Sequence, residues 1–213
     1  MARTILDVSR WQGTIDWEKV KASGKVDGVM IRALGSARYK PYLDPAFERN
    51  YKSATDVGLP VGVYYYSTAI TKAQADAELA MLKSALAGKT LSLPVAVDIE
   101  DAHLTWLDKQ ALTDLVAYAL GEIQSWGVYA MLYTGLYFAQ TNLYMGGAAL
   151  KPYDVWLAAY RTVKPAPGWP FGMWQYTASG NLPGVSTVVD LSEAYKDYTG
   201  IIKRKGLDKV KWA

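Results

Sequence analysis

The segment LPVAVDIED at residues 93–101 is the clearest indication of the architecture, because a short apolar run ends here in a cluster of acids. The run has the length and composition of a β-strand. Alternation along this strand turns Val95, Val97 and Ile99 toward one face and Asp98 and Glu100 toward the other. If the first face is covered by helices, the two acids point into the mouth of a barrel.

Seven other segments share the strand pattern, and helical periods fill the gaps between the earlier ones. The predicted strands are residues 4–10, 27–34, 60–68, 93–100, 128–134, 154–160, 171–177 and 185–191. The predicted helices are residues 16–24, 44–58, 71–88 and 108–127, with Asp44 and Thr71 as N-caps. Strands that alternate with helices predict parallel βαβ units, and the last third has few helix signals. We therefore predict an α/β fold, a modified TIM-type barrel with eight strands and fewer than eight helices, similar to (βα)5β3.

No repeat or linker interrupts the 213 residues, so residues 1–200 are predicted to form a single barrel domain, followed by a basic C-terminal tail at 201–213. The last eleven residues carry five basic side chains and one acidic one, a net charge of +4. Since the whole chain has a net charge of +3, the rest of it has a net charge of about −1 (3 − 4). A body of this charge argues against nucleic-acid binding, which needs a basic face. The tail is expected to be a solvated end, with contact to an anionic wall polymer as the alternative.

The composition excludes several kinds of chemistry. Cysteine is absent and His103 is the single histidine, so disulfides, thiolate sites and a poly-histidine metal site are excluded. A Ser–His–Asp enzyme would need His103 as its base; we expect His103 to be a loop residue, with a place beside the cleft as the alternative. No apolar run approaches the roughly 20 residues that cross a bilayer, so membrane insertion is not expected. The start, MARTILDVSRWQG, does not have the pattern of a signal peptide.

Acids are predicted at the ends of three separate strands, where the active groups of barrel enzymes gather. They are Asp7, the pair Asp98 and Glu100, and Asp190. Residues two apart on a strand lie about 6.6–6.8 Å apart, so the pair can reach one glycosidic bond. Like charges at this spacing raise one pKa toward that of a general acid. The alternative is an exposed acidic strand end without function. The 16 Tyr and 8 Trp residues suit sugar stacking, although a tyrosine-rich core gives the same count.

Six blocks of sequence resemble glycoside hydrolase family 25, the lysozymes or N-acetylmuramidases of phages, bacteria and fungi. The blocks are DVSRWQG at 7–13, GVYYYS at 62–67, PVAVDIE at 94–100, VWLAAY at 155–160, MWQYTASG at 173–180 and VVDLSEAY at 188–195. The resemblance implies an eight-stranded modified barrel. It also implies hydrolysis of the β-1,4 bond between N-acetylmuramic acid and N-acetylglucosamine in bacterial peptidoglycan, with no metal or cofactor.

The resemblance also implies site residues. Glu100 resembles the family's general acid and Asp98 its partner carboxylate, while Asp7 and Asp190 resemble acids that shape the cleft. Positions that match residues lining the cleft are Tyr64, Tyr133, Trp156, Tyr160, Trp174 and Gln175. The chain departs from the family pattern at Arg10 and Tyr65, where the family often has histidine.

Three mechanisms are open at this stage, and Asp98 has a role in two of them. Asp98 could orient the substrate's own 2-acetamido group as the nucleophile, which we favour, or attack the anomeric carbon itself. Asp7 or Asp190 could instead activate water directly, with inversion. Two other functions remain open: a chitinase-like hydrolase of acetamido sugars, and a non-catalytic wall-binding module. We expect a monomer that acts on the bacterial wall, either as a phage endolysin made in the host cytoplasm or as a secreted enzyme whose leader was removed.

Overall fold

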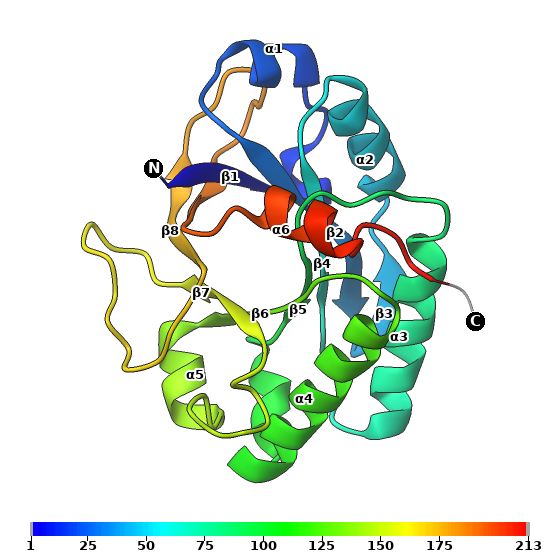
Figure 1. The fold of residues 1–213 in the computed structure, drawn as a ribbon, viewed down its shortest axis with the longest axis vertical. Helices are drawn as coiled ribbons and strands as arrows, with labels where there is room; N and C mark the ends of the chain where they lie inside the picture. Colours follow the sequence, from blue (N-terminus) through cyan, green and yellow to red (C-terminus); the bar gives the residue numbers. More distant parts are fainter. Residues whose placement is uncertain (1, 212–213) are drawn as a thin grey trace.

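Eight strands close into a barrel in the computed structural model, which describes residues 2–211 (Figure 1). The barrel strands are β1 (Arg3–Val8), β2 (Gly28–Ala37), β4 (Val61–Tyr66), β5 (Val95–Asp98), β6 (Ala130–Gly135), β7 (Asp154–Ala158), β8 (Met173–Gly180) and β9 (Val189–Ala194). The pairing of β1 with β2 closes the ring, and all neighbours run parallel except β9, which is antiparallel to both β8 and β1. The predicted barrel is therefore confirmed.

Helices follow the first five barrel strands and are absent between the last three. Residues 2–211 hold six α-helices: α1 (Trp17–Ala22), α2 (Phe47–Asp56), α3 (Lys72–Ala85), α4 (Lys109–Ser125), α5 (Leu136–Asn142) and α6 (Tyr198–Lys205). Two 3-10 turns, η1 (Arg10–Gln12) and η2 (Ala102–Trp106), follow β1 and β5. Within the described residues, no helix has the length and apolar character that crossing a membrane requires.

The alternation predicted for β5 is present in the packing. Val95 and Val97 belong to a large apolar cluster in which the sheet packs against the helices, whereas Ala96 belongs to a second cluster inside the barrel. Met30, Leu93 and Met131 are also part of this inner cluster. The barrel interior is thus filled with side chains below its mouth, as in other barrels of this size.

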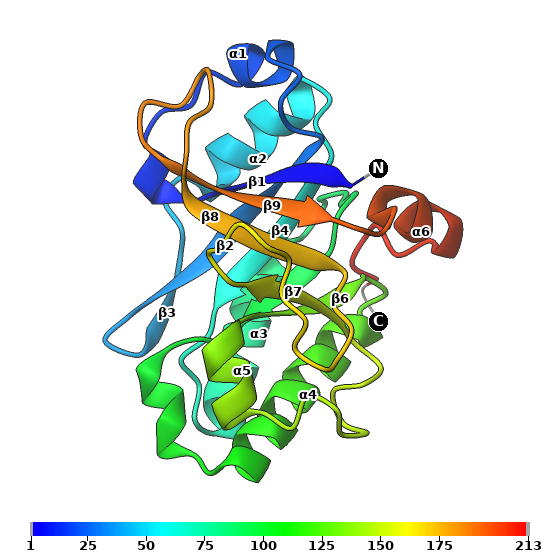
Figure 2. The same ribbon diagram turned by 90° about the vertical axis from the view of Figure 1, so that its left-hand side faces the viewer.

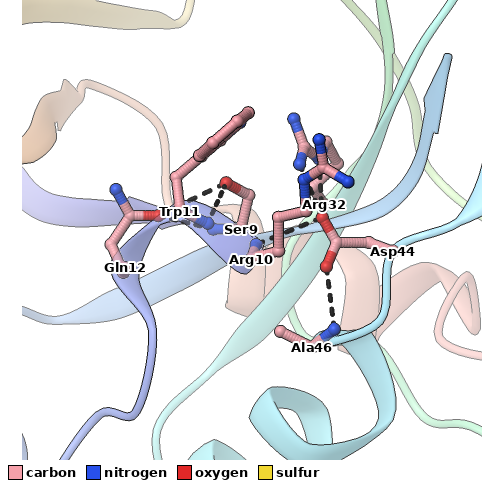
Figure 3. Close-up of polar contacts among 7 residues, drawn as sticks. All are labelled: Ser9, Arg10, Trp11, Gln12, Arg32, Asp44 and Ala46. Atoms are coloured by element: carbon pink, nitrogen blue, oxygen red, sulfur yellow. Dashed lines mark hydrogen bonds and ion pairs between the residues drawn. The ribbon is translucent and has the colours of Figure 1, made fainter. Parts of the chain in front are cut away.

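The predicted N-cap at Asp44 is wrong, because α2 begins two residues later, with Ala46 at the N-cap position. The Asp44 carboxylate is buried and forms an ion pair with Arg32, with Nη2 and Oδ2 2.7 Å apart (Figure 3). It also accepts a hydrogen bond from the backbone N–H of Ala46 at 2.9 Å. A nearly buried guanidinium is stable only beside an opposite charge, and the Asp44 carboxylate therefore pairs with Arg32 instead of capping α2. Thr71, by contrast, caps α3 as predicted.

Three elements were not expected from the sequence: the short strand β3 (Lys40–Leu43), α5 and α6. β3 forms a hairpin with β2 that projects from the barrel at the end where α5 lies, and α6 lies at the opposite end (Figure 2). α6 crosses the boundary predicted at residue 200, and Ile202 is buried. The backbone N–H of Lys211 donates to the carbonyl of Trp126 at 2.7 Å, so the described part of the basic tail lies against the barrel.

We expect Gly62→Ala to destabilise the barrel by about 1–3 kcal/mol, the usual cost of overpacking a filled interior. A Cβ atom at this position of β4 would lie 2.6 Å from Leu93 Cβ, 2.6 Å from Met30 Sδ and 2.7 Å from the Pro94 carbonyl oxygen. Urea unfolding measures the change. Gly146→Ala is the control, because its Cβ would have no neighbour within 4 Å among residues 2–211. Equal stability of Gly62→Ala and the wild type would contradict this account of the packing.

Candidate active site

The four predicted acids lie on one rim of the barrel. Asp7 lies near the end of β1, Asp98 is the last residue of β5, and Glu100 follows it by two residues. Asp190 was expected at the end of a strand, but it is the second residue of β9. Because β9 runs antiparallel, its beginning lies where its neighbours end, and the register pairs Asp190 directly with Asp7.

These acids surround a pocket of about 230 Å³ in the barrel mouth, which we call the mouth pocket. Its lining residues are Asp7, Ser9, Trp11, Gln12, Arg32, Tyr64, Tyr66, Asp98, Glu100, Tyr133, Trp156, Tyr160 and Asp190. Eight of the ten predicted site residues are therefore brought together around one cavity. The two that do not line it, Gln175 and Trp174, are neighbours on β8 and turn to opposite faces of that strand.

Gln175 lies directly behind the mouth pocket and is fully buried. Its Nε2 donates to Asp7 Oδ2 at 3.0 Å, and its Oε1 accepts from the hydroxyls of Tyr133 at 2.9 Å and Tyr160 at 3.0 Å. This amide links side chains from three strands or strand ends. It therefore holds the rim in place, although it does not face the cavity itself.

Trp174 is not among the residues that line the mouth pocket, and its indole N–H donates to the carbonyl of Ala159 at 2.8 Å. Trp156 instead forms part of the cavity wall. The Tyr133 ring packs edge-on against the Trp156 ring, with centroids 4.6 Å apart. The Trp156 Nε1 donates a hydrogen bond to Ser192 Oγ at 3.0 Å. The wall of the pocket is thus fixed by packed aromatic rings and satisfied polar atoms.

Burial raises the pKa of every carboxyl group in the mouth pocket. For Asp7 the rise is large, and the neighbouring charge of Asp190 adds to it. For Asp98, burial acts first and the charge of Glu100 second. Burial also raises the pKa of Asp190.

Glu100 differs from Asp98 in its access to solvent. Glu100 is exposed at the mouth, yet surrounding protein atoms desolvate it and raise its pKa, with Asp190 as the next cause. Asp98 is only 3% exposed, and within residues 2–211 its Oδ1 has no hydrogen-bond partner. The arrangement therefore contains one carboxyl group that can exchange protons with a bound molecule and one held beneath it.

Several lining residues were not identified as site residues from the sequence. Arg32 is the lining cation, and its position as a lone charge within the apolar strand GVMIRAL is a signal that identifies it. Trp11 reaches the cavity from η1, where Ser9 and Gln12 form a reciprocal capping box (Figure 3). Tyr66 donates to Asp101 Oδ2 at 2.7 Å and so braces the loop that carries Glu100.

His103 lies in η2, outside the set of residues that line the mouth pocket. Its ring is stacked on Tyr39 with centroids 3.8 Å apart and contacts Trp106 at 4.3 Å. Within the described residues, no group of three or more His, Asp or Glu side chains is arranged to hold a metal ion. The side chains that line the mouth pocket supply carboxyl groups, hydroxyls, one amide, aromatic rings and one guanidinium.

We expect Asp98→Asn to raise the melting temperature at pH 7 and to leave it unchanged at pH 3. The folded-state pKa of Asp98 is raised above the ordinary value of about 3.9, so its contribution to stability is present below that value and is lost as pH rises. The asparagine side chain of the variant cannot ionise, so the variant does not lose this stability as pH rises. Calorimetry at both pH values measures it, with Asp114→Asn on the exposed surface of α4 as the control. A lower melting temperature of Asp98→Asn at pH 7 would contradict the assignment.

Comparison with known proteins places this chain in a family. The model of glycosyl hydrolases family 25 matches residues 6–185. Lysozyme M1 of Streptomyces globisporus is 29% identical, over 87% of this chain and 65% of its own length. The catalytic domain of endolysin ply40, from bacteriophage P40 of Listeria monocytogenes, has a TM-score of 0.76 at 25% identity, covering 97% of this chain and 98% of the domain. The bacterial lysozyme of Streptomyces coelicolor has a TM-score of 0.78 at 22% identity, covering 92% and 93%.

The family match includes the barrel rim with Asp7, Asp98 and Glu100 and extends over most of the described chain. Because of this extent, the chain belongs to family 25 of the glycosyl hydrolases, and it is a glycoside hydrolase.

Proposed function

We propose that the protein is a lysozyme that hydrolyses the β-1,4 bond between N-acetylmuramic acid and N-acetylglucosamine in bacterial peptidoglycan. The observation that carries this proposal is the ring of carboxyl groups with raised pKa around one aromatic-lined pocket. Two carboxyl groups at a scissile bond, one of them protonated, are what glycoside hydrolysis requires. The names of the relatives, lysozyme and endolysin, support peptidoglycan as the substrate.

Glu100 is the proposed general acid. Its raised pKa keeps a proton available at higher pH, and its exposure at the mouth lets that proton reach the leaving oxygen of a bound glycan. After burial, the charges of Asp190 and Asp101 raise the pKa of Glu100 further and so help to keep it protonated. The Tyr133 hydroxyl also lies in the field of both carboxyl groups, where burial raises its pKa and keeps it a hydrogen-bond donor.

Asp98 is proposed to orient the substrate's 2-acetamido group, whose carbonyl oxygen then attacks the anomeric carbon. The free Oδ1 of Asp98 supports this role, because it can accept the acetamido N–H. Every sugar of the proposed substrate carries this group. Direct attack by Asp98 and activation of water by Asp7 or Asp190 are the competing mechanisms.

Exposed aromatic rings at the two edges of the mouth pocket supply surfaces on which sugars stack. Trp11 is 66% exposed and Tyr160 is 59% exposed. Burial raises the pKa of Tyr160 to about 12, so its hydroxyl stays protonated at neutral pH and remains available for hydrogen bonding. An aromatic body with a polar tip suits a ligand whose faces are apolar and whose edges are hydroxyls.

Glu100→Gln is expected to lose about 10²-fold or more in turnover, the scale of general acid catalysis, and Asp98→Asn should lose a comparable amount. The measurement is digestion of purified peptidoglycan, followed by borohydride reduction and mass spectrometry of the products. Glu122→Gln on α4 is the matched control and should retain full activity. Near-normal turnover by Glu100→Gln would overturn the assignment of the general acid.

The reducing ends in the same experiment identify the bond. New muramitol ends that disappear with Glu100→Gln are expected. Glucosaminitol ends would instead indicate that the enzyme cleaves the other glycosidic bond of the strand and has a different specificity. If the wild type releases no new ends, the proposed function fails and the wall-binding module becomes the better interpretation.

The first-formed product is expected to be the β-anomer, because attack by the acetamido group followed by attack of water inverts the anomeric carbon twice. Proton NMR during the first minutes of digestion of a soluble glycan measures this outcome. Initial α-anomer would contradict assistance and would favour water activated by Asp7 or Asp190. Peptidoglycan deacetylated at the muramic acid nitrogen separates the two retaining routes, since only direct attack by Asp98 would still cleave it.

A further inference from the structure

A second hollow adjoins the mouth pocket on the side of α5. It has a volume of about 460 Å³ and is formed by the end of β6, the first turns of α5 and the residues after β7. We call it the α5 groove. Glu100 and Tyr160 line both hollows, so the α5 groove continues directly from the proposed site of bond cleavage.

The strand order shows how an elongated ligand can use both hollows. In the ring of eight strands, β6 lies four positions from β1 and is therefore diametrically opposite to it. Trp11, after β1, lines one side of the mouth pocket, and the α5 groove opens beside the end of β6. A linear chain that crosses the mouth from Trp11 passes the acids and Glu100 and then enters the α5 groove.

The two hollows differ sharply in charge. The mouth pocket is lined by four carboxyl groups and one cation, Arg32, which is already paired with Asp44. Among the described residues that line the α5 groove, Glu100 is the one acid and Arg161 the one cation. Arg161 is exposed and has no ion-pair partner within residues 2–211. An anionic group is therefore better accommodated in the α5 groove than in the mouth pocket.

Further features of the groove suit a charged sugar. Lys109 Nζ donates to the carbonyl of Gln140 at 2.9 Å, which places a second cation near the end of the groove that Gln140 lines. The Tyr137 ring is 80% exposed on the groove, where it has the open face that stacking on a sugar requires. The hollow thus offers an aromatic surface together with unpaired positive charge.

We propose that the α5 groove binds a glycan residue that bears a carboxylate substituent, with Arg161 pairing with the carboxylate and Tyr137 packing on the sugar. This inference rests on the proposed function, since it takes the ligand to be part of the strand that is cleaved at Glu100. The carboxylate has two possible sources in such a strand, the lactyl ether of the sugar and the peptide attached to it. Both present the same chemistry to Arg161.

The test compares Arg161→Gln with the wild type on three soluble glycan substrates. The first carries its peptides, the second has them removed by an amidase and retains the lactyl carboxylate, and the third has these carboxylates converted to methylamides. On carboxylate-bearing strands, Arg161→Gln should raise KM about fivefold at low salt and leave kcat unchanged, the scale of one exposed ion pair. Added salt at 0.5 M should remove most of the difference.

The control is Arg204→Gln, an exposed arginine on α6 at the other end of the barrel, which should behave as wild type on all three substrates. An effect of Arg161→Gln on the first substrate alone places the carboxylate in the peptide. An effect on the second substrate alone places it on the lactyl group, which is an amide while the peptide is attached. An effect on both means that Arg161 accepts either carboxylate. An equal effect on the methylamide strands, or no effect on any, overturns the inference. If the wild type cleaves none of the three, the proposed function fails instead.

Discussion

The antiparallel pairing of β9 with β1 and β8 is the constraint on which the site depends. Six parallel pairings build most of the ring, and β9 fills the remaining space while running in the opposite direction. Its first residues therefore lie at the rim where the parallel strands end, and Asp190 faces Asp7 there. A parallel final strand would carry this acid to the far end of the barrel. The reversal also removes the need for a crossover helix between the last strands.

The site is assembled against an electrostatic cost. Four carboxyl groups share the mouth with Arg32, and the guanidinium is already engaged by the buried Asp44. Burial raises the pKa of the carboxyl groups because little counter-charge is available to them. The filled interior beneath the mouth provides the rigidity that holds such groups together. A site of this kind reduces stability locally while keeping a proton available for chemistry.

Much of the barrel could be predicted from the sequence, because hydrophobic alternation is a local property. The strand LPVAVDIE and the helix cap at Thr71 needed no knowledge of distant residues. The direction of β9 and the ion pair of Asp44 depend on contacts far apart in the chain, so local patterns missed both. Trp174 and its neighbour Gln175 show a related limit, because which of two adjacent residues faces inward depends on the register of the strand.

The two departures from the family pattern now have different meanings. Tyr65 is fully buried and packs in the apolar cluster between sheet and helices, so it cannot touch a ligand in the mouth. Arg10 is exposed, and its guanidinium lies 4.6 Å from the ring centroid of Trp11, which lines the mouth pocket. A second ring, that of Tyr42, lies 5.3 Å from the same guanidinium. The change at position 65 therefore concerns packing, whereas the change at position 10 places a cation beside an exposed aromatic ring of the mouth pocket.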